Sequence, residues 1–202
     1  MTSVGIGLTN NCDLHCAHCY RDQDRIYNLT LEDIEKICDS LEISSIGFGT
    51  GENGLNPHYI EIIDYLRAKG IRLTLASNGY TLTITPDEML SYFGDVEFSI
   101  DFPDQKRQDE FRGEGNWQTI MNSIERCARL GIKVSILAVL MNVNFKDQGR
   151  IAKLAASLGA DFRVNVYQPM YTDKFLLSFD QYWEAYRILF DAAEIISVTE
   201  PL

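Results

Sequence analysis

The sequence predicts an α/β protein built on a parallel sheet. Short apolar or β-branched segments alternate with longer amphipathic segments six times along the 202 residues, which is the pattern of repeated strand–loop–helix units. Several amphipathic segments also end on a glycine directly before the next apolar segment, where a left-handed residue can end a helix. Strands joined through helices pair in parallel by right-handed crossovers, so we expect a parallel sheet covered by helices.

The candidate strands are short and apolar. They cover residues 3–9, 44–49, 71–77, 96–100, 132–140 and 162–167. Six such units fit a doubly wound sheet with helices on both faces, and they fit equally an incomplete barrel with helices only outside. In either architecture the loops after the carboxyl ends of the strands gather at one rim, where we expect the functional residues.

The amphipathic segments between the strands carry helix start and stop signals. Thr-Pro-Asp-Glu at 85–88 reads as a capping box with proline at the first helical position, and Asn-Pro at 56–57 opens another helix similarly. Ser178 with Gln181 caps the last helix. The predicted helix-ending glycines are Gly70, Gly94, Gly131 and Gly159.

Helical periodicity predicts which side chains are buried. Cys38 falls on the apolar stripe of Ile34 and Ile37. Cys127 aligns with Ile124 in the same way, so we expect both cysteines in the core. In the last helix we expect an aromatic stripe to pack on the sheet, or, if the chain is truncated, part of it to be an exposed former interface; it comprises Phe179, Tyr182, Trp183, Tyr186 and Phe190.

Length and composition predict one globular domain over residues 1–202. No apolar run approaches membrane-spanning length, and no basic and apolar segment opens the chain, so neither membrane insertion nor export is supported. A net charge of −11 argues against broad contact with nucleic-acid phosphates. Five cysteines, three of them crowded, indicate a reducing compartment, and we expect the cytoplasm.

The crowded cysteines, Cys12, Cys16 and Cys19, lie within eight residues. Thiolates at short fixed spacing bind soft metals or iron–sulfur clusters. A closed structural site or an electron-transfer cluster fills its coordination positions with protein, whereas three ligands leave one metal position open for a substrate or cofactor. The motif therefore predicts a centre that carries out chemistry.

Two other kinds of site share part of this pattern. A structural zinc site would use His15 or His18 as a fourth ligand, but zinc knots usually stabilise domains with little core, and this chain has ample apolar residues. A ferredoxin-like electron carrier would need a fourth cysteine that the motif does not supply. Colour separates an iron–sulfur centre from a zinc site, because an iron–sulfur protein is brown and a zinc protein is colourless.

Small polar residues follow the second, third and fourth predicted strands. The loop GTGEN at 49–53 combines glycines, which permit close backbone approach, with the carboxylate of Glu52, an acceptor for an ammonium or hydroxyl group. Ser77 and Asn78 follow the third strand, and Ser-Ile-Asp at 99–101 ends the fourth. Each loop alone is typical of an ordinary turn, but their shared position at strand ends predicts one ligand site.

Together these motifs resemble the radical S-adenosylmethionine (SAM) superfamily over nearly the whole chain. The three cysteines match its C-x3-C-x2-C signature, which follows the first strand. GTGEN is similar to its second-strand motif, although Thr50 stands where the family commonly has glycine and Asn53 where it often has proline. With the family comes a partial (β/α)6 barrel of TIM type, with parallel strands and outer helices.

The resemblance implies a role for each motif. The cysteines would hold a [4Fe-4S] cluster, whose fourth iron would bind the amino and carboxylate groups of SAM. Reductive cleavage of SAM would give a 5′-deoxyadenosyl radical that abstracts a hydrogen atom, with no further catalytic residue implied. The cofactor-binding positions that match the family are His18, Gly49, Thr50, Gly51, Glu52, Ser77, Asn78, Ser99 and Arg112.

Within that set, Glu52 would hold the amino group of SAM. His18 would lie against adenine, where the family usually has an aromatic residue. Ser99 would contact the ribose or carboxylate, assisted by Arg112, and Asp101 is a weaker candidate for a ribose contact.

The resemblance also bears on the substrate. The chain is most similar to members that modify ribosomally synthesised peptides or protein side chains, and Asn165 and Tyr167 would line the substrate side of the cavity. The alternative is an enzyme for a small molecule such as a deazapurine precursor. The family implies a flavodoxin- or ferredoxin-type electron donor. Because such cores are often followed by an auxiliary-cluster extension, we expect that extension to be absent or truncated here.

Overall fold

The computed structural model describes residues 2–22 and 24–192, and its strands confirm the predicted sheet. The strands are β1 (Thr2–Ile6), β2 (Ile43–Phe48), β3 (Arg72–Ser77), β4 (Phe93–Ser99), β5 (Lys133–Leu140) and β6 (Asp161–Val166). Their order in the sheet, β1-β2-β3-β4-β5-β6, is their order in the chain, whereas a doubly wound sheet reverses direction at a switch point. The sequential order selects the partial (β/α)6 barrel and confirms the predicted fold class.

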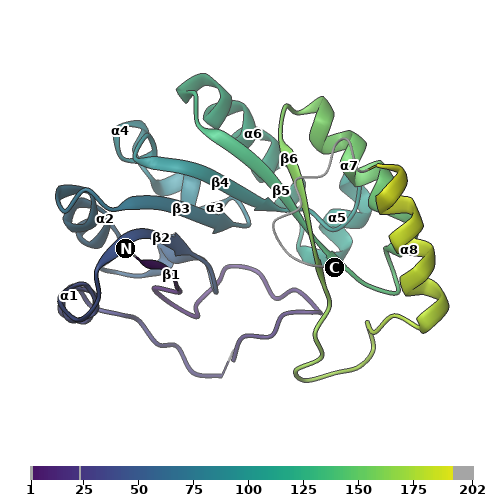
Figure 1. Ribbon diagram of the computed structural model, residues 1–202, viewed down its shortest axis with the longest axis horizontal. Helices are drawn as coiled ribbons and strands as arrows, with labels where there is room; N and C mark the ends of the chain where they lie inside the picture. The colour runs from purple at the N-terminus through teal and green to yellow at the C-terminus, as the bar shows by residue number, and fades with distance from the viewer. Residues whose placement is uncertain (1, 23, 193–202) are drawn as a thin grey trace. The chain divides into compact units, whose positions relative to one another are not determined.

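Helices alternate with the strands, as Figure 1 shows. The α-helices are α1 (Leu31–Ser40), α2 (Tyr59–Ala68), α3 (Tyr80–Ile84), α4 (Asp87–Leu90), α5 (Gln105–Arg112), α6 (Asn116–Leu130), α7 (Gln148–Ser157) and α8 (Phe179–Asp191). Short 3-10 helices precede α2 and α7; they are η1 (Asn53–Leu55) and η2 (Phe145–Asp147).

The chain divides into two compact units. Unit 1 comprises 1–14, 21–97 and 119–133, and unit 2 comprises 15–20, 98–118 and 134–202, each within the described range. The single domain expected over 1–202 stays a prediction.

Unit 1 contains β1, β2 and β3 with helices α1 and α2. β2 pairs in parallel with β1 and with β3, and the register sets Ile46 opposite Leu73 and Phe48 opposite Leu75. These four side chains are buried, as are Ile62, Ile63 and Leu66 of α2. The alternation of apolar residues in β2 and β3 therefore builds the core of this unit. Helices α1 and α2 lie next to each other in Figure 1.

Unit 2 contains β5 and β6 with helices α5, α7 and α8. β5 pairs in parallel with β6, and the buried side chains of Ile136 and Phe162 lie at opposite positions. α7 packs on β6, and α8 lies beside α7 (Figure 1). α8 begins with the predicted capping box, in which the Ser178 hydroxyl accepts the N–H of Gln181 and the Gln181 side chain accepts the N–H of Ser178.

Some predicted helix boundaries are wrong. The Thr85 hydroxyl donates to the carbonyl of Thr81, 2.6 Å away, so Thr85 closes α3 rather than capping α4. α4 begins after Pro86 without a side-chain cap. Gly94 lies inside β4 and ends no helix. The other predicted helix-ending glycines have the expected positive φ; they are Gly70, Gly131 and Gly159.

The predicted burial of the α8 aromatic stripe is also wrong. Phe179 is 77% exposed and Phe190 is 71% exposed, and Trp183 and Tyr186 are exposed as well. The helix instead buries Ala185 and Leu189. The sheet is already covered by α7, and α8 packs on α7 and η2 through this narrow face.

The two cysteines outside the motif differ in burial. Cys127 in α6 is fully buried, which confirms its predicted place in the core. Cys38 is only partly buried, because α1 buries Ile34 most deeply and leaves the residues near its carboxyl end closer to solvent. Over the described residues, no helix is both long enough and apolar enough to cross a membrane.

Candidate functional site

The motif cysteines lie in the loop that follows β1. Arg21 is buried, and its guanidinium donates to the carbonyls of Asn10, at 3.0 Å, and Leu14. Further along, the N–H of Cys19 donates to the carbonyl of Cys16 at 3.0 Å. Arg21 thus fixes the start of the loop, and a tight turn joins its last two cysteines.

Burial favours the neutral form of the Cys12 and Cys16 thiols. Desolvation raises the pKa of Cys12 to about 12, and it raises the pKa of Cys16 although the guanidinium of Arg112 lowers it. Within residues 2–22 and 24–192, no group of three or more histidine, cysteine, aspartate or glutamate side chains is arranged to hold a metal ion. The donor chemistry of three thiols fits iron, and a bound iron would offset the cost of ionising buried thiols. Cluster ligation by Cys12, Cys16 and Cys19 stays a prediction.

Glu52, in unit 1, is a buried carboxylate surrounded by neutral donors. It is 1% exposed, and it accepts hydrogen bonds from the Ser77 hydroxyl and from the N–H groups of Asn78, at 3.0 Å, and Thr81, at 2.7 Å. Burial raises the pKa of Glu52, and these hydrogen bonds oppose the rise. We name Glu52, Ser77, Asn78 and Thr81 the Glu52 cluster; it brings together three of the predicted SAM-binding residues.

Asn78 connects the Glu52 cluster to the cysteine loop. Its Nδ2 donates to Asp13 Oδ1 at 2.7 Å and to the sulfur of Cys12 at 3.5 Å. Its backbone N–H donates to Glu52, so one residue contacts both the predicted SAM acceptor and a predicted cluster ligand. This contact agrees with the grouping of the two motifs at one rim.

The backbone of the second-strand loop lies close to the first loop. A Cβ on Gly51 would stand 2.3 Å from the carbonyl oxygen of Thr9 and 2.6 Å from that of Asn11, and Gly51 has a φ of +67°. Only glycine fits there. Thr50 has a φ of +60°, a conformation that favours glycine, which explains why a family motif would have glycine at this position.

Two buried asparagines that the sequence did not single out as site residues hold the same loops together. Asn53 accepts the N–H of Leu8 on its Oδ1 at 2.9 Å, and Asn56 donates to the carbonyls of Leu8, at 2.6 Å, and Leu29, at 2.9 Å. Asn56 also accepts the N–H of His58, so α2 begins after this turn and later than the predicted start at 56–57. Asn53 stands where the family often has proline. Its side chain makes a hydrogen bond to a residue 45 positions away in the sequence.

Asp101, in unit 2, is a buried carboxylate paired with a cation. It is fully buried, and its Oδ2 accepts from Arg112 Nε at 2.8 Å and Nη2 at 2.7 Å. Its Oδ1 accepts the N–H of Val139 in β5 at 2.8 Å. Burial lowers the pKa of Arg112, but the charge of Asp101, its hydrogen bond and the charges of Cys16 and Cys19 together outweigh burial, and the net pKa is raised. The predicted ribose contact of Asp101 stays untested, and its carboxylate is engaged with Arg112.

His18 lies beside this pair. Its Nε2 is 3.8 Å from Asp101 Oδ2, and its ring stacks on Phe111 with centroids 5.1 Å apart. Burial lowers the pKa of His18 to about 4, which outweighs the opposite influence of Asp101. Its Nδ1 is buried and lacks a hydrogen-bond partner among the described residues. A buried polar atom without a partner is typical of a ligand site, and this one fits the predicted contact with a nucleobase.

Ser99 ends β4 and is partly buried. Its carbonyl accepts from Gln108 Nε2 at 3.0 Å, and Gln108 Oε1 accepts the N–H groups of Asp101, at 3.0 Å, and Phe102, at 3.2 Å. Gln108 thereby fixes the loop that carries Asp101. A glutamine on a polar helix gives no signal in the sequence until its partners are known, and the predicted contact of the Ser99 hydroxyl with SAM stays a prediction.

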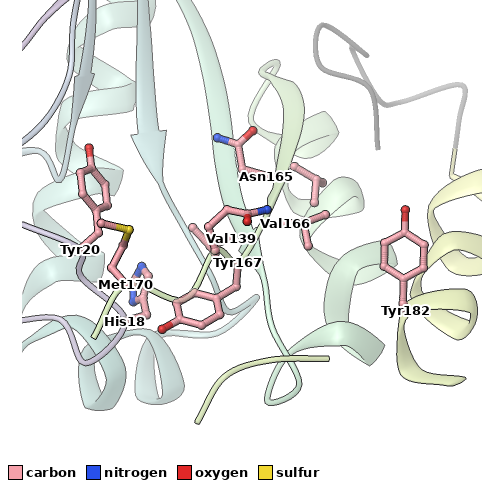
Figure 2. A pocket seen from close by; sticks show the side chains of 10 residues that line it. His18, Tyr20, Val139, Asn165, Val166, Tyr167, Met170 and Tyr182 are labelled. Carbon is pink, nitrogen blue, oxygen red and sulfur yellow. The ribbon is translucent and has the colours of Figure 1, made fainter. Parts of the chain in front are cut away.

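Unit 2 also contains a pocket of about 800 Å³, which is in the range of small-molecule sites. Figure 2 shows the side chains that line it; they are His18, Tyr20, Val139, Val164, Asn165, Val166, Tyr167, Gln168, Met170 and Tyr182. None of these lining residues is an aspartate, glutamate, lysine or arginine. Asn165 and Tyr167, predicted to line a cavity, do so, and they share it with His18.

Comparison with known proteins supports the family resemblance of the sequence motifs. The family model for the radical SAM superfamily matches residues 6–155, more than half of the chain. The mycofactocin maturase MftC of Mycolicibacterium smegmatis is 26% identical over 172 residues, covering 80% of this chain and 43% of MftC. A probable GTP 3′,8-cyclase of Pyrococcus abyssi is 26% identical over 167 residues, covering 79% of this chain and 55% of the cyclase. The chain thus spans about half the length of these relatives.

Solved structures show the same fold. SuiB of Streptococcus suis bound to its precursor peptide SuiA superposes with a TM-score of 0.80 at 16% identity, covering 95% of this chain and 46% of SuiB. SuiB has also been solved bound to S-adenosylmethionine, with a TM-score of 0.75 at 17% identity, covering 95% of this chain and 48% of SuiB. The cofactors of this family are a [4Fe-4S] cluster and SAM. From its fold, its cysteine motif and its match to the family model, the chain belongs to the radical SAM superfamily.

Proposed function

We propose that this chain modifies a ribosomally synthesised peptide or a protein side chain by radical SAM chemistry. The observation that carries the proposal is the link from the cysteine loop to a buried acceptor: Asn78 contacts both Cys12 and Glu52. A maturase, MftC, and SuiB, solved with a precursor peptide, are among the similar proteins, which supports a peptide as substrate.

In this proposal each group of residues has one task. Cys12, Cys16 and Cys19 hold the cluster, and the carboxylate of Glu52 accepts the ammonium group of SAM. The cluster and SAM, when bound, supply the reductive cleavage of SAM and the 5′-deoxyadenosyl radical that abstracts hydrogen.

In unit 2, the pocket is assigned to an uncharged part of a ligand. The pocket is lined by His18, Asn165 and Tyr167, and His18 would lie against the adenine of SAM. A lining without formal charge suits an uncharged nucleoside or substrate group, because a charged group would lose its hydration without gaining a counter-ion there. Ser99 and Arg112 complete the set proposed to contact the ribose or carboxylate of SAM.

A second candidate is a small-molecule enzyme. The probable GTP 3′,8-cyclase of Pyrococcus abyssi is as identical to this chain as MftC is, at 26%, which favours a deazapurine precursor or similar nucleotide-derived substrate as the alternative. A structural zinc site does not fit, because members of this superfamily use an iron–sulfur cluster. A cytoplasmic location and a flavodoxin- or ferredoxin-type donor are part of the proposal, since an oxygen-sensitive cluster needs a reducing compartment and an electron source.

Anaerobic reconstitution with iron and sulfide tests the proposal. We expect a brown protein that forms 5′-deoxyadenosine from SAM under dithionite, measured by mass spectrometry, and a faster yield with a precursor peptide than with GTP. Cys16→Ala should abolish cluster assembly, whereas the matched control Cys38→Ala, outside the motif, should retain it. A Cys16→Ala protein that still cleaves SAM would refute the assignment, and stimulation by GTP alone would favour the second candidate.

A further inference from the structure

The Asp101–Arg112 pair is enclosed by the protein. Asp101 is fully buried and Arg112 is 9% exposed, and both Arg112 donors go to a single oxygen, Oδ2. The other oxygen is held by the N–H of Val139, and the Asp101 carbonyl by Asn144 Nδ2 at 3.0 Å. Asp101 cannot turn away from Arg112 without also breaking its hydrogen bond to Val139, so the orientation of the carboxylate is fixed.

The pair also lies against the cysteine loop. The sulfur of Cys16 is 3.8 Å from the carbonyl oxygen of Arg112, and His18 Nε2 is 3.8 Å from Asp101. Arginine stays charged at every accessible pH, and the charge of Arg112 acts on Cys16, so an unpaired guanidinium would leave an uncompensated positive charge acting on a predicted cluster ligand. Charges in buried surroundings act strongly on one another and are little screened by salt.

The reduction potential of an iron–sulfur cluster depends on the net charge around it. A positive charge favours the reduced cluster and raises the potential, and a negative charge lowers it. Arg112 and Asp101 act on Cys16 in opposite directions, so the charge of Asp101 offsets part of the influence of Arg112 there.

We propose that Asp101 is a positioning residue that holds Arg112 beside Cys16 and cancels its charge there, so that the pair keeps the potential of a cluster bound at Cys16 from rising. This inference rests on the proposed cluster site. It adds an electrostatic task to a residue that the sequence suggested only as a weak ribose contact.

The test is a redox titration of the reconstituted protein, followed by the electron paramagnetic resonance signal of the reduced cluster in the absence of SAM. Asp101→Asn should shift the potential upwards, because Arg112 loses its counter-charge. Arg112→Gln should shift it downwards when the titration is run at a pH where the remaining carboxylate is ionised, because its negative charge is then uncompensated. The double variant should return close to the wild-type potential. Arg107→Gln is the matched control, since Arg107 is on the same helix and pairs with Asp147 at 2.6 Å but is 36% exposed; its shift should be the smallest.

Opposite shifts support the proposal, since a merely structural pair would move the potential in one direction or not at all. Folded variants with an unchanged potential, or with shifts of the same sign, overturn it. If Asp101→Asn does not fold, Arg112→Gln decides alone: a lower potential supports the proposal and any other result overturns it. A wild-type protein that builds no cluster overturns the proposed function together with this inference. A wild-type protein that cleaves SAM while its variants show no shift overturns this inference only.

Discussion

Two buried carboxylates, one in each compact unit, are stabilised by different kinds of hydrogen-bond donor. Glu52 in unit 1 is surrounded by a hydroxyl and two backbone N–H groups, all of them neutral. Asp101 in unit 2 is held by the guanidinium of Arg112 and a single N–H. Neutral donors stabilise a carboxylate without cancelling its charge, whereas a guanidinium cancels it.

The difference assigns different tasks to the two side chains. Glu52 keeps a negative charge that an ammonium group can still use, so it is suited to a ligand. The charge of Asp101 is already matched, so it is suited to fixing Arg112. A buried carboxylate is therefore informative about function only once its partners are known.

Removing the Asp101 carboxylate should have the largest effect. Asp101→Ala leaves a buried guanidinium without a counter-ion, and we expect the free energy of unfolding to fall by about 3–5 kcal/mol. Adding Arg112→Met should recover part of that loss, because two well-packed apolar groups can replace a buried pair. Urea unfolding followed by circular dichroism measures both. No recovery in the double variant would contradict the assignment of the pair as the dominant interaction.

The comparison also explains what the sequence could predict. The strands, the capping box at Ser178 and Glu52 follow from patterns within a few residues of the chain, and the structure has them where the patterns indicate. The Asp101–Arg112 pair is hidden, because it joins residues 11 apart whose partnership depends on how the loop after β4 folds against α5. Asn53 is hidden for the same reason, with its partner Leu8 45 residues away.

Glu52→Gln should weaken binding of SAM while leaving the cluster in place. The amide keeps the shape of the side chain but removes the charge, and hydrogen bonds to charged groups contribute about 1.5–3 kcal/mol, so we expect roughly a 10- to 100-fold higher Kd. Anaerobic equilibrium binding to the reconstituted protein gives the Kd, and iron analysis gives the cluster content. Unchanged SAM affinity would contradict the different tasks assigned to the two carboxylates.

Titration separates the two carboxylates further. Burial raises the pKa of Glu52 above its ordinary value of 4.5, so the folded protein binds that proton more tightly than the unfolded chain. The stability that this proton contributes is present below the ordinary pKa and is lost as the pH rises through the raised pKa of the folded state. The free energy of unfolding of the wild type relative to Glu52→Gln should therefore fall with rising pH in that window, as urea titrations at several pH values would measure. A difference that rises with pH would show that the hydrogen bonds outweigh burial.

Helical periodicity predicted the wrong buried face for α8, because packing between helices decides which of its residues are buried. The aromatic stripe of α8 has the spacing of a buried face, yet α8 buries Ala185 and Leu189. Hydrophobic spacing shows that a face is apolar, but it does not show which neighbour is close enough to cover it. α7 already covers the sheet beside β6, so α8 packs on α7 through its smaller residues.

The smallest effect should come from the exposed counterpart of the buried pair. Arg107 donates to Asp147 at 2.6 Å and its guanidinium lies 4.4 Å from the ring centre of Phe102, but the side chain is 36% exposed. Asp147 also accepts from Arg150 at 3.0 Å, so Arg107→Gln leaves that carboxylate with a cationic partner. We therefore expect a loss of only about 0–1 kcal/mol, measured by the same urea unfolding, and a loss that shrinks further in high salt. A loss as large as that of Asp101→Ala would mean that burial does not separate the two pairs, and the electrostatic task inferred for Asp101 would lose its physical basis.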